Sequence, residues 1–132
     1  MKMKVIFFVI LSTISVLINA QTLKAFLYTT NFNSPDNKSY IETYLSFDAN
    51  SVQLIQDENN KYFGELDVYI EITKANELIF NDHYALKSPY FKDSIANNLL
   101  FIDQHRIGIE NGEYLLTIKV KDIHANDELL VH

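Results

Sequence analysis

The chain has 132 residues, 17 Asp and Glu against 11 Lys and Arg, a net charge of −6, and neither cysteine nor tryptophan. This charge disfavours nucleic-acid binding, which needs Lys and Arg to replace condensed counterions, and it offers no polybasic segment for anionic lipid. The absence of cysteine excludes disulfides, thiol catalysis and thiolate metal sites.

The N-terminus has the anatomy of a secretory signal peptide. Two lysines precede the apolar run Val5–Leu17, and the small residue Ala20 closes the segment. The run is shorter than the about 20 residues that span a membrane, so an uncleaved anchor is the lesser alternative. We expect a signal peptide helix over residues 1–20, cleavage before Gln21, and one mature domain over residues 21–132, whose net charge is −8 once two lysines are lost.

The mature segments alternate apolar and polar residues with a period of two, which predicts strands rather than helices. In chain order, the expected strands cover residues 22–32, 40–47, 51–56, 62–73, 77–87, 99–109 and 114–121. Clusters of Asn, Asp, Ser and Pro punctuate them and predict turns. About seven short strands are typical of an immunoglobulin-like antiparallel β-sandwich, and a β-barrel is the main alternative.

One expected strand contains a polar gap. Asp103–Arg106 interrupts the apolar alternation between Phe101 and Ile107. A β-bulge or bend at the gap would account for it.

The last part of the chain predicts a position within the fold. Glu110–Gly112 forms a sharp turn in which Gly112 tolerates positive φ, and Tyr114 follows two residues later. We expect Tyr114 to form a tyrosine corner before the penultimate strand, with an ordinary core-facing tyrosine as the alternative. Glu128–Val131 would then begin the last strand. We expect His132 to be a premature end of a longer chain, and a short terminal edge strand is the other interpretation.

Several motifs resemble a known family. They are Phe32–Phe47, Asn50–Gln53, Leu86–Pro89, Phe101–Ile107 and Asn111–Asp122. In order and spacing they resemble the N-terminal region of GWxTD domain-containing proteins. The resemblance implies a longer exported protein in the periplasm or cell envelope of a gram-negative bacterium. Because the chain has no tryptophan, it has no GWxTD motif, so nothing tied to that motif carries over, and the resemblance implies no activity.

Candidate catalytic groups are few. Asp82 precedes His83, and Asp103 lies two residues before His105, but neither pair lies beside a nucleophile elbow. Adjacent residues on a strand point to opposite faces, so Asp82 and His83 cannot easily cooperate. We interpret these residues as surface polar groups, and we expect no catalytic residue and no enzyme.

Two acidic segments offer oxygen ligands of the kind that Ca²⁺ uses. They are Asp57–Asn60, and Asp122 together with Asn126–Glu128. Turns rich in Asp and Asn explain both segments, and the four histidines have no zinc-ligand spacing. We expect no metal and no cofactor.

Exposed aromatic residues are the most informative surface feature. The expected outer faces of the strands carry Phe26, Tyr28, Tyr40, Glu42, Tyr44 and Tyr69. Contiguous exposed patches tend to mark interfaces, so we expect these residues to bind a protein partner or the missing downstream domains of the same chain. A sugar-binding platform and simple cross-strand aromatic pairing are the alternatives.

These observations together predict an exported, non-catalytic structural or protein-interaction module. The alternative is a carbohydrate-binding module or a non-catalytic part of a cell-envelope enzyme. We expect neither nucleic-acid binding nor membrane attachment after signal cleavage.

Overall fold

The computed structural model describes residues 22–94, 99–125 and 128–131. The predicted signal peptide over residues 1–20 and the chain end at His132 lie outside these residues. The described part of the chain folds into strands, joined by turns and a single 3-10 turn. The prediction of an all-β, antiparallel fold is therefore confirmed for the described residues.

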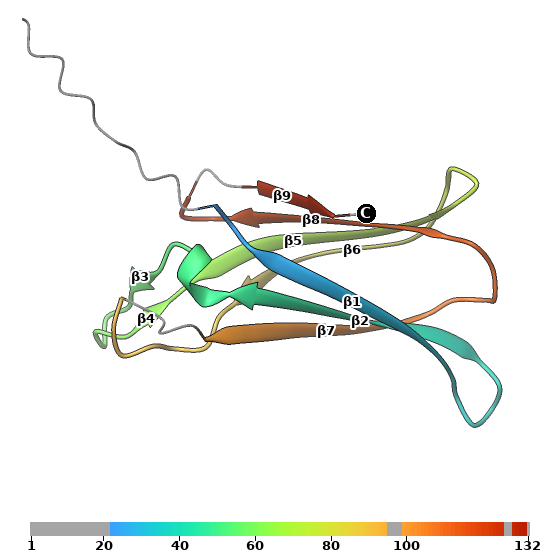
Figure 1. Ribbon diagram of the computed structural model, residues 1–132, viewed down its shortest axis with the longest axis horizontal. Helices are drawn as coiled ribbons and strands as arrows, with labels where there is room; N and C mark the ends of the chain where they lie inside the picture. The colour runs from blue at the N-terminus through green and yellow to red at the C-terminus, as the bar shows by residue number, and fades with distance from the viewer. Residues whose placement is uncertain (1–21, 95–98, 126–127, 132) are drawn as a thin grey trace, which may run out of the picture.

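Seven strands of the described residues form two antiparallel sheets (Figure 1). One sheet has the order β1-β2-β7, with β1 (Ala25–Asn33), β2 (Ser39–Asp48) and β7 (Leu100–Gly108). The other has the order β6-β5-β8-β9, with β5 (Glu65–Lys74), β6 (Glu77–Lys87), β8 (Leu115–Asp122) and β9 (Glu128–Val131). A short pair, β3 (Ile55–Gln56) and β4 (Tyr62–Phe63), lies at one end.

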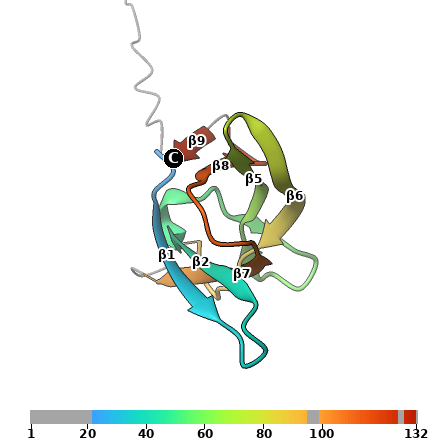
Figure 2. The same ribbon diagram turned by 90° about the vertical axis from the view of Figure 1, so that its right-hand side faces the viewer.

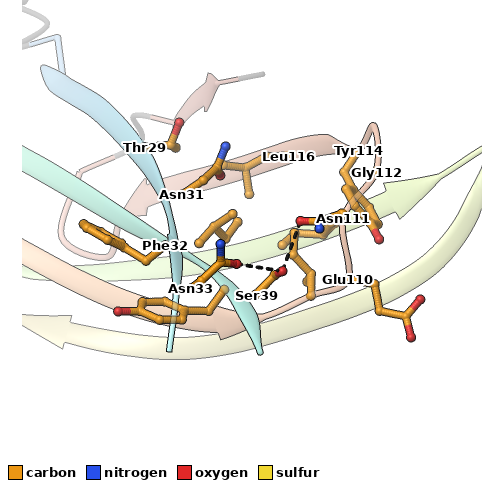
Figure 3. Close-up of a pocket in the computed structure, with 14 residues that line it drawn as sticks. Thr29, Asn31, Phe32, Asn33, Ser39, Glu110, Asn111, Gly112, Tyr114 and Leu116 are labelled. Carbon is orange, nitrogen blue, oxygen red and sulfur yellow. Dashed lines mark hydrogen bonds between the residues drawn. The ribbon is translucent and has the colours of Figure 1, made fainter. Parts of the chain in front are cut away.

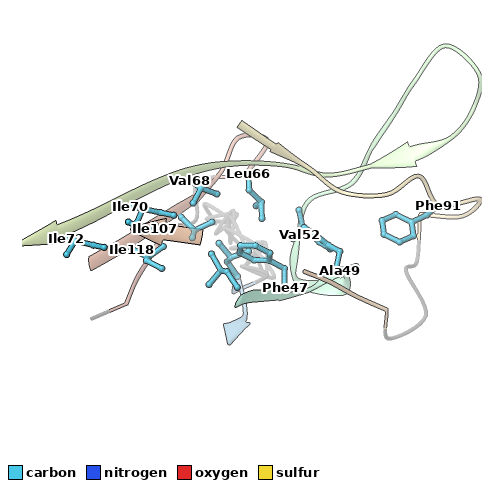
Figure 4. Packing of buried hydrophobic residues seen from close by; sticks show 14 residues of the cluster. Phe47, Ala49, Val52, Leu66, Val68, Ile70, Ile72, Phe91, Ile107 and Ile118 are labelled. Carbon is cyan, nitrogen blue, oxygen red and sulfur yellow. The ribbon is translucent and has the colours of Figure 1, made fainter. Parts of the chain in front are cut away.

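The two sheets face one another and enclose the core (Figure 2). Strand alternation supplies that core, because every second residue points inward. The most buried row runs along β5 as Leu66, Val68, Ile70 and Ile72 (Figure 4). Opposite it, Phe47 of β2 stacks on Phe101 of β7, with ring centroids 5.1 Å apart.

The strand β7 shows no interruption. Its register with β2 is continuous from Asp48↔Leu100 to Tyr40↔Gly108, so the predicted bulge at Asp103–Arg106 is wrong. The polar gap arises because Asp103 and His105 lie on the inner face of the sheet, opposite Leu45 and Thr43. The irregularity occurs instead between Ile72 and Thr73 of β5.

Two predicted strands are shorter than their alternation indicates. The strand predicted over residues 51–56 is reduced to β3, and the 3-10 turn η1 (Ala49–Ser51) overlaps its predicted start. The Asp48 carboxylate caps this turn by accepting a hydrogen bond from the Asn50 N–H. Residues 62–73 divide into β4 and β5 at Gly64, whose N–H donates to the Ser88 hydroxyl at 2.8 Å. A side-chain partner thus replaces a ladder bond at each break.

Candidate functional site

The outer face of the β1-β2-β7 sheet is rich in aromatic side chains. Phe26, Tyr28 and Phe32 alternate along β1, and the register places Tyr44 opposite Tyr28 and Tyr40 opposite Phe32. We call these five residues the aromatic face. Phe26 and Tyr28 are each 65% exposed, which is unusual for large rings on a sheet.

Cross-strand ring contacts order the aromatic face. The centroids of Tyr28 and Tyr44 lie 6.1 Å apart in a tilted arrangement, and Phe32 stacks on Tyr40 at 5.5 Å. Pairs of this kind stabilise a sheet by about 0.2–1 kcal/mol each. The rings therefore form an ordered surface.

Glu42 anchors the centre of this surface. Its Oε2 atom accepts a hydrogen bond from the Tyr44 hydroxyl at 2.5 Å, and its Oε1 atom accepts from Nε and Nη2 of Arg106 at 3.0 and 2.6 Å. The hydrogen bond from Tyr44, followed by that from Arg106, holds the pKa of Glu42 below its ordinary value. The Arg106 guanidinium also lies 4.8 Å from the Tyr40 ring centroid, so one cation fixes both the carboxylate and a ring.

The neighbouring strand β7 extends the surface with aliphatic residues. Leu100 and Ile102 pair with Asp48 and Ser46 of β2, and both are exposed. Sequence reasoning missed them, although alternation along β7 places both on the outer face. The sequence could not show that β7 lies beside β2, because the two strands are about sixty residues apart in the chain.

Tyr69 does not join the aromatic face. It lies on β5, in the other sheet, where it pairs with His83 and Lys119. Its hydroxyl donates to Glu71 at 2.8 Å, which raises the pKa of Tyr69 above its ordinary value. Of the six residues predicted to form one interaction patch, the structure brings together the other five.

Tyr114 lies directly before β8, the strand that precedes β9. Its hydroxyl makes no hydrogen bond within the described residues, so the tyrosine corner stays a prediction. Gly112 does not use the positive φ that glycine tolerates. Its lack of a side chain serves packing, because a Cβ there would lie 3.1 Å from Cε2 of Tyr114 and 3.3 Å from Nζ of Lys74.

A cavity of about 380 Å³ opens beside Tyr114 at one end of the sandwich (Figure 3). Its floor is aliphatic, from Ile41, Ile72, Ile109 and Leu116. Its walls carry side-chain amides and hydroxyls from β1, from the start of β2 and from the loop between β7 and β8. The sequence did not predict this cavity, because its lining residues come from four strands, β1, β2, β5 and β8, and from the loop between β7 and β8.

Acidic residues and a histidine meet where β6 faces β7. The Tyr84 hydroxyl donates to Asp103, and the Tyr84 ring stacks on His105 with centroids 4.7 Å apart. His105 Nε2 lies 3.4 Å from Asp103, and its Nδ1 lies 3.9 Å from Asp82. We call these four residues the inter-sheet clasp.

The inter-sheet clasp corrects the interpretation of Asp103 and His105 as surface groups. They occupy inner-face positions of β7, and their side chains are only 15% and 24% exposed, whereas the Asp82 side chain, at 44%, stays largely in contact with solvent. Burial, together with the hydrogen bond to Asp103, raises the pKa of Tyr84 far above its ordinary value. His83, in contrast, points outward and contacts Asp67 at 2.7 Å, as alternation predicts.

The acidic turns bind backbone N–H groups. Asp57 accepts from the N–H groups of Asn59 and Lys61, and buried Asp122 accepts from those of Gln53 and His124. Residues 126–127 of the second segment lie outside the described residues. Within the described ranges, no three His, Asp or Glu side chains are grouped so as to hold a metal ion.

Comparison with protein-family models, curated proteins and solved structures finds no match for the chain. No helix in the described part of the chain has the length and apolar character needed to cross a membrane. The function must therefore be argued from the surfaces themselves.

Proposed function

We propose that this chain is an exported, non-catalytic interaction module of immunoglobulin-like architecture, and that a protein partner docks on its aromatic face. The single observation that carries the proposal is the set of exposed rings on the outer face of the β1-β2-β7 sheet, with Phe26 and Tyr28 the most exposed. Large aromatic residues are enriched at protein interfaces, where their burial contributes most of the binding energy.

The immunoglobulin-like assignment is supported by strand order. In that architecture, strands A, B and E form one sheet, and strands G, F, C and C′ form the other. Here β1, β2 and β7 would correspond to A, B and E, and β9, β8, β5 and β6 to G, F, C and C′. Tyr114 would then stand at the corner between E and F.

The geometry of the aromatic face favours binding. Its polar centre is already satisfied, because Glu42 is bound by Tyr44 and Arg106. A partner would therefore cover rings without stripping water from an unpaired carboxylate, whose desolvation is costly. The rings are also held by cross-strand contacts, which lowers the conformational entropy lost on binding.

A catalytic role is less well supported by the inter-sheet clasp. Asp82, Asp103 and His105 do not line the cavity beside Tyr114. Asp103 is occupied by Tyr84, and Tyr84 is kept protonated by burial, so it is a poor nucleophile. We assign the clasp a structural role.

The resemblance to GWxTD domain-containing proteins sets the proposed context. We infer that the chain corresponds to the N-terminal module of such an exported protein, in the periplasm or cell envelope of a gram-negative bacterium. The partner of the aromatic face would be another domain of that protein or a separate envelope protein. Proximity labelling by crosslinking can identify either one.

The test replaces Tyr28 with a benzophenone amino acid in cells that export the protein. Illumination should yield a discrete crosslinked protein, because Tyr28 is one of the two most exposed rings of the aromatic face. The same substitution at Tyr69 is the matched control, since Tyr69 is also an outer-face tyrosine near a glutamate but belongs to the other sheet. Equal adducts from both positions, or none from Tyr28, would overturn the proposal.

A second arm separates surface loss from misfolding. A crosslinker at Ile102, on the edge of the same face, should lose its adduct when Phe26 and Tyr28 are both changed to serine. The thermal midpoint of this double variant should stay close to that of the parent, because both side chains are mostly exposed.

A further inference from the structure

The cavity at the end of the sandwich is lined by amides and hydroxyls that protein docking on the aromatic face does not use, although Phe32 and Tyr40 of that face also line it. Along β1, the residues that face the other sheet change character. Leu23 and Leu27 are apolar, but Thr29, Asn31 and Asn33 follow on the same side. Polar groups thus replace apolar ones on an inward row where the cavity begins.

Side-chain amides converge there from separate elements (Figure 3). The Ser39 hydroxyl lies 3.1 Å from Oδ1 of Asn33 and 3.0 Å from Oδ1 of Asn111. One hydroxyl has a single proton, so it cannot satisfy both amides by donation. The Asn31 side chain makes no hydrogen bond within the described residues. Several amide donors and acceptors are therefore free to bind a ligand.

The floor of the cavity is apolar, and its charge is low. Ile72 is buried, and Ile109 and Leu116 lie beside it, while the Tyr114 ring stands at the rim. Among the described residues that line the cavity, Glu110 alone is charged. A phosphate or carboxylate ligand would find no cation among these residues, and the nearby Lys74 ammonium lies over the Tyr114 ring, 5.3 Å from its centroid.

We propose that this cavity binds a neutral saccharide ring. Such a ligand combines many hydroxyl groups, which amides and hydroxyls bind as donor and acceptor, with an apolar face that packs on aliphatic and aromatic side chains. A cavity of about 380 Å³ is within the range of small-molecule sites. A peptide that adds a strand fits less well, because it would bind the backbone groups of a sheet edge, whereas this cavity offers side-chain amides.

The test is a titration of the ¹⁵N-labelled mature chain with glucose, galactose, mannose, N-acetylglucosamine and their disaccharides, followed by amide NMR. At least one saccharide should shift the side-chain amide signals of Asn31, Asn33 and Asn111 in a saturable way. Shifts confined to the aromatic face, or none with any saccharide, would overturn the proposal. So would stronger shifts of the same amides with a neutral tripeptide.

Two substitutions localise the site. Asn31→Leu keeps the size of the side chain and removes its amide, and Asn111→Ala removes an amide in a loop, where folding is less at risk. Each should weaken binding about tenfold, since one hydrogen bond to the ligand is lost. Asn81→Ala, on the exposed outer face of β6, is the control and should leave the affinity unchanged. Unaltered affinity in both cavity variants would place the ligand elsewhere.

Discussion

Glu42 occupies a position that strand alternation assigns to solvent, yet only 7% of its side chain is exposed. Tyr44 and Arg106 cover it and neutralise it, so a nominally wet position behaves as the fixed centre of the aromatic face. The same pattern of a tyrosine bound to a glutamate two residues away recurs at Tyr69 and Glu71.

Acid should weaken this arrangement. Because the pKa of Glu42 is lower in the folded chain than its ordinary value of 4.5, the ionised carboxylate stabilises the fold above that pH. The stabilisation is lost as pH falls through the lowered pKa. Glu42→Gln should therefore be less stable than the parent at pH 7, and the difference should shrink as pH falls below 4.5. Urea unfolding at several pH values measures it, and a constant difference would contradict the assignment.

Two phenylalanines on β1 and β2 should differ sharply in their effect on stability. Phe47 is fully buried and stacked on Phe101, so Phe47→Ala should lower the free energy of unfolding by about 3–5 kcal/mol. Phe26→Ala, on the exposed face, should change it by less than about 0.5 kcal/mol. Denaturant unfolding of both variants makes the comparison, and similar losses would mean that the inner and outer faces are wrongly assigned.

The inter-sheet clasp offers a third test at the residue scale. Tyr84→Phe removes the hydroxyl that binds Asp103 and should cost about 1–2 kcal/mol. Tyr69→Phe, which also removes a hydroxyl bound to a carboxylate, should cost less than Tyr84→Phe, because its partner Glu71 retains access to water.

The Tyr84→Phe variant also tests the raised pKa of Tyr84. Stability from the protonated phenol is present below its ordinary pKa of 10.0 and is lost only as pH rises through the raised value. Difference absorbance between the parent and Tyr84→Phe should therefore show no Tyr84 phenolate at pH 11 while the chain stays folded. A phenolate signal at that pH would contradict the burial of this hydroxyl.

At the scale of elements, glycine and side-chain caps set where strands begin and end. Gly64 separates β4 from β5 and packs against Val52, which follows η1. Alternation continues through this position in the sequence, so periodicity alone predicts one long strand. The break depends on Ser88, which lies 24 residues away and binds the Gly64 N–H.

Gly64→Ala should be destabilising, because the new Cβ would lie 2.5 Å from Cγ1 of buried Val52. Overpacking of this kind costs about 1–3 kcal/mol. Gly108→Ala at the end of β7 is the control, since a Cβ there meets no atom within 4 Å, and it should leave stability unchanged or slightly raised. Thermal unfolding of the two variants decides the point, and equal midpoints would argue against close packing at Gly64.

The tight turn between β5 and β6 shows the same dependence on context. Ala75 and Asn76 both adopt positive φ, which two-residue hairpins require. Asn tolerates this conformation, whereas Ala does so at a cost. The turn at residues 74–76 was predictable, but its demand for positive φ at an alanine followed from the register of β5 and β6.

At the scale of the whole molecule, the two outer faces differ in chemistry. The β1-β2-β7 sheet exposes rings and aliphatic groups, while the outer row of β5 in the other sheet carries mainly acidic residues. An exported module with one such aromatic face can bind a partner while the charged outer rows of β5 and β8 stay in water. The predicted export can be tested directly.

The mature protein should begin at Gln21 when the chain is produced with its N-terminus in a gram-negative host. Mass spectrometry of the periplasmic fraction should find the chain without residues 1–20. Recovery of the uncleaved chain in the membrane fraction would support the anchor alternative.

Strand content and the alternation of faces could be read from residue order, because period-two patterning and Asn- or Asp-rich turns act locally. That is why Leu66–Ile72 was recognised as a core row and Tyr28 and Tyr44 as outward rings. Sheet order is not local. Only the tertiary structure showed that Tyr69 lies in the other sheet and that Ile102 lies beside the aromatic face. It also showed that Asp103 and His105 face inward, and that Asn31 and Asn111 line one cavity. These arrangements depend on which distant strands pair and face one another.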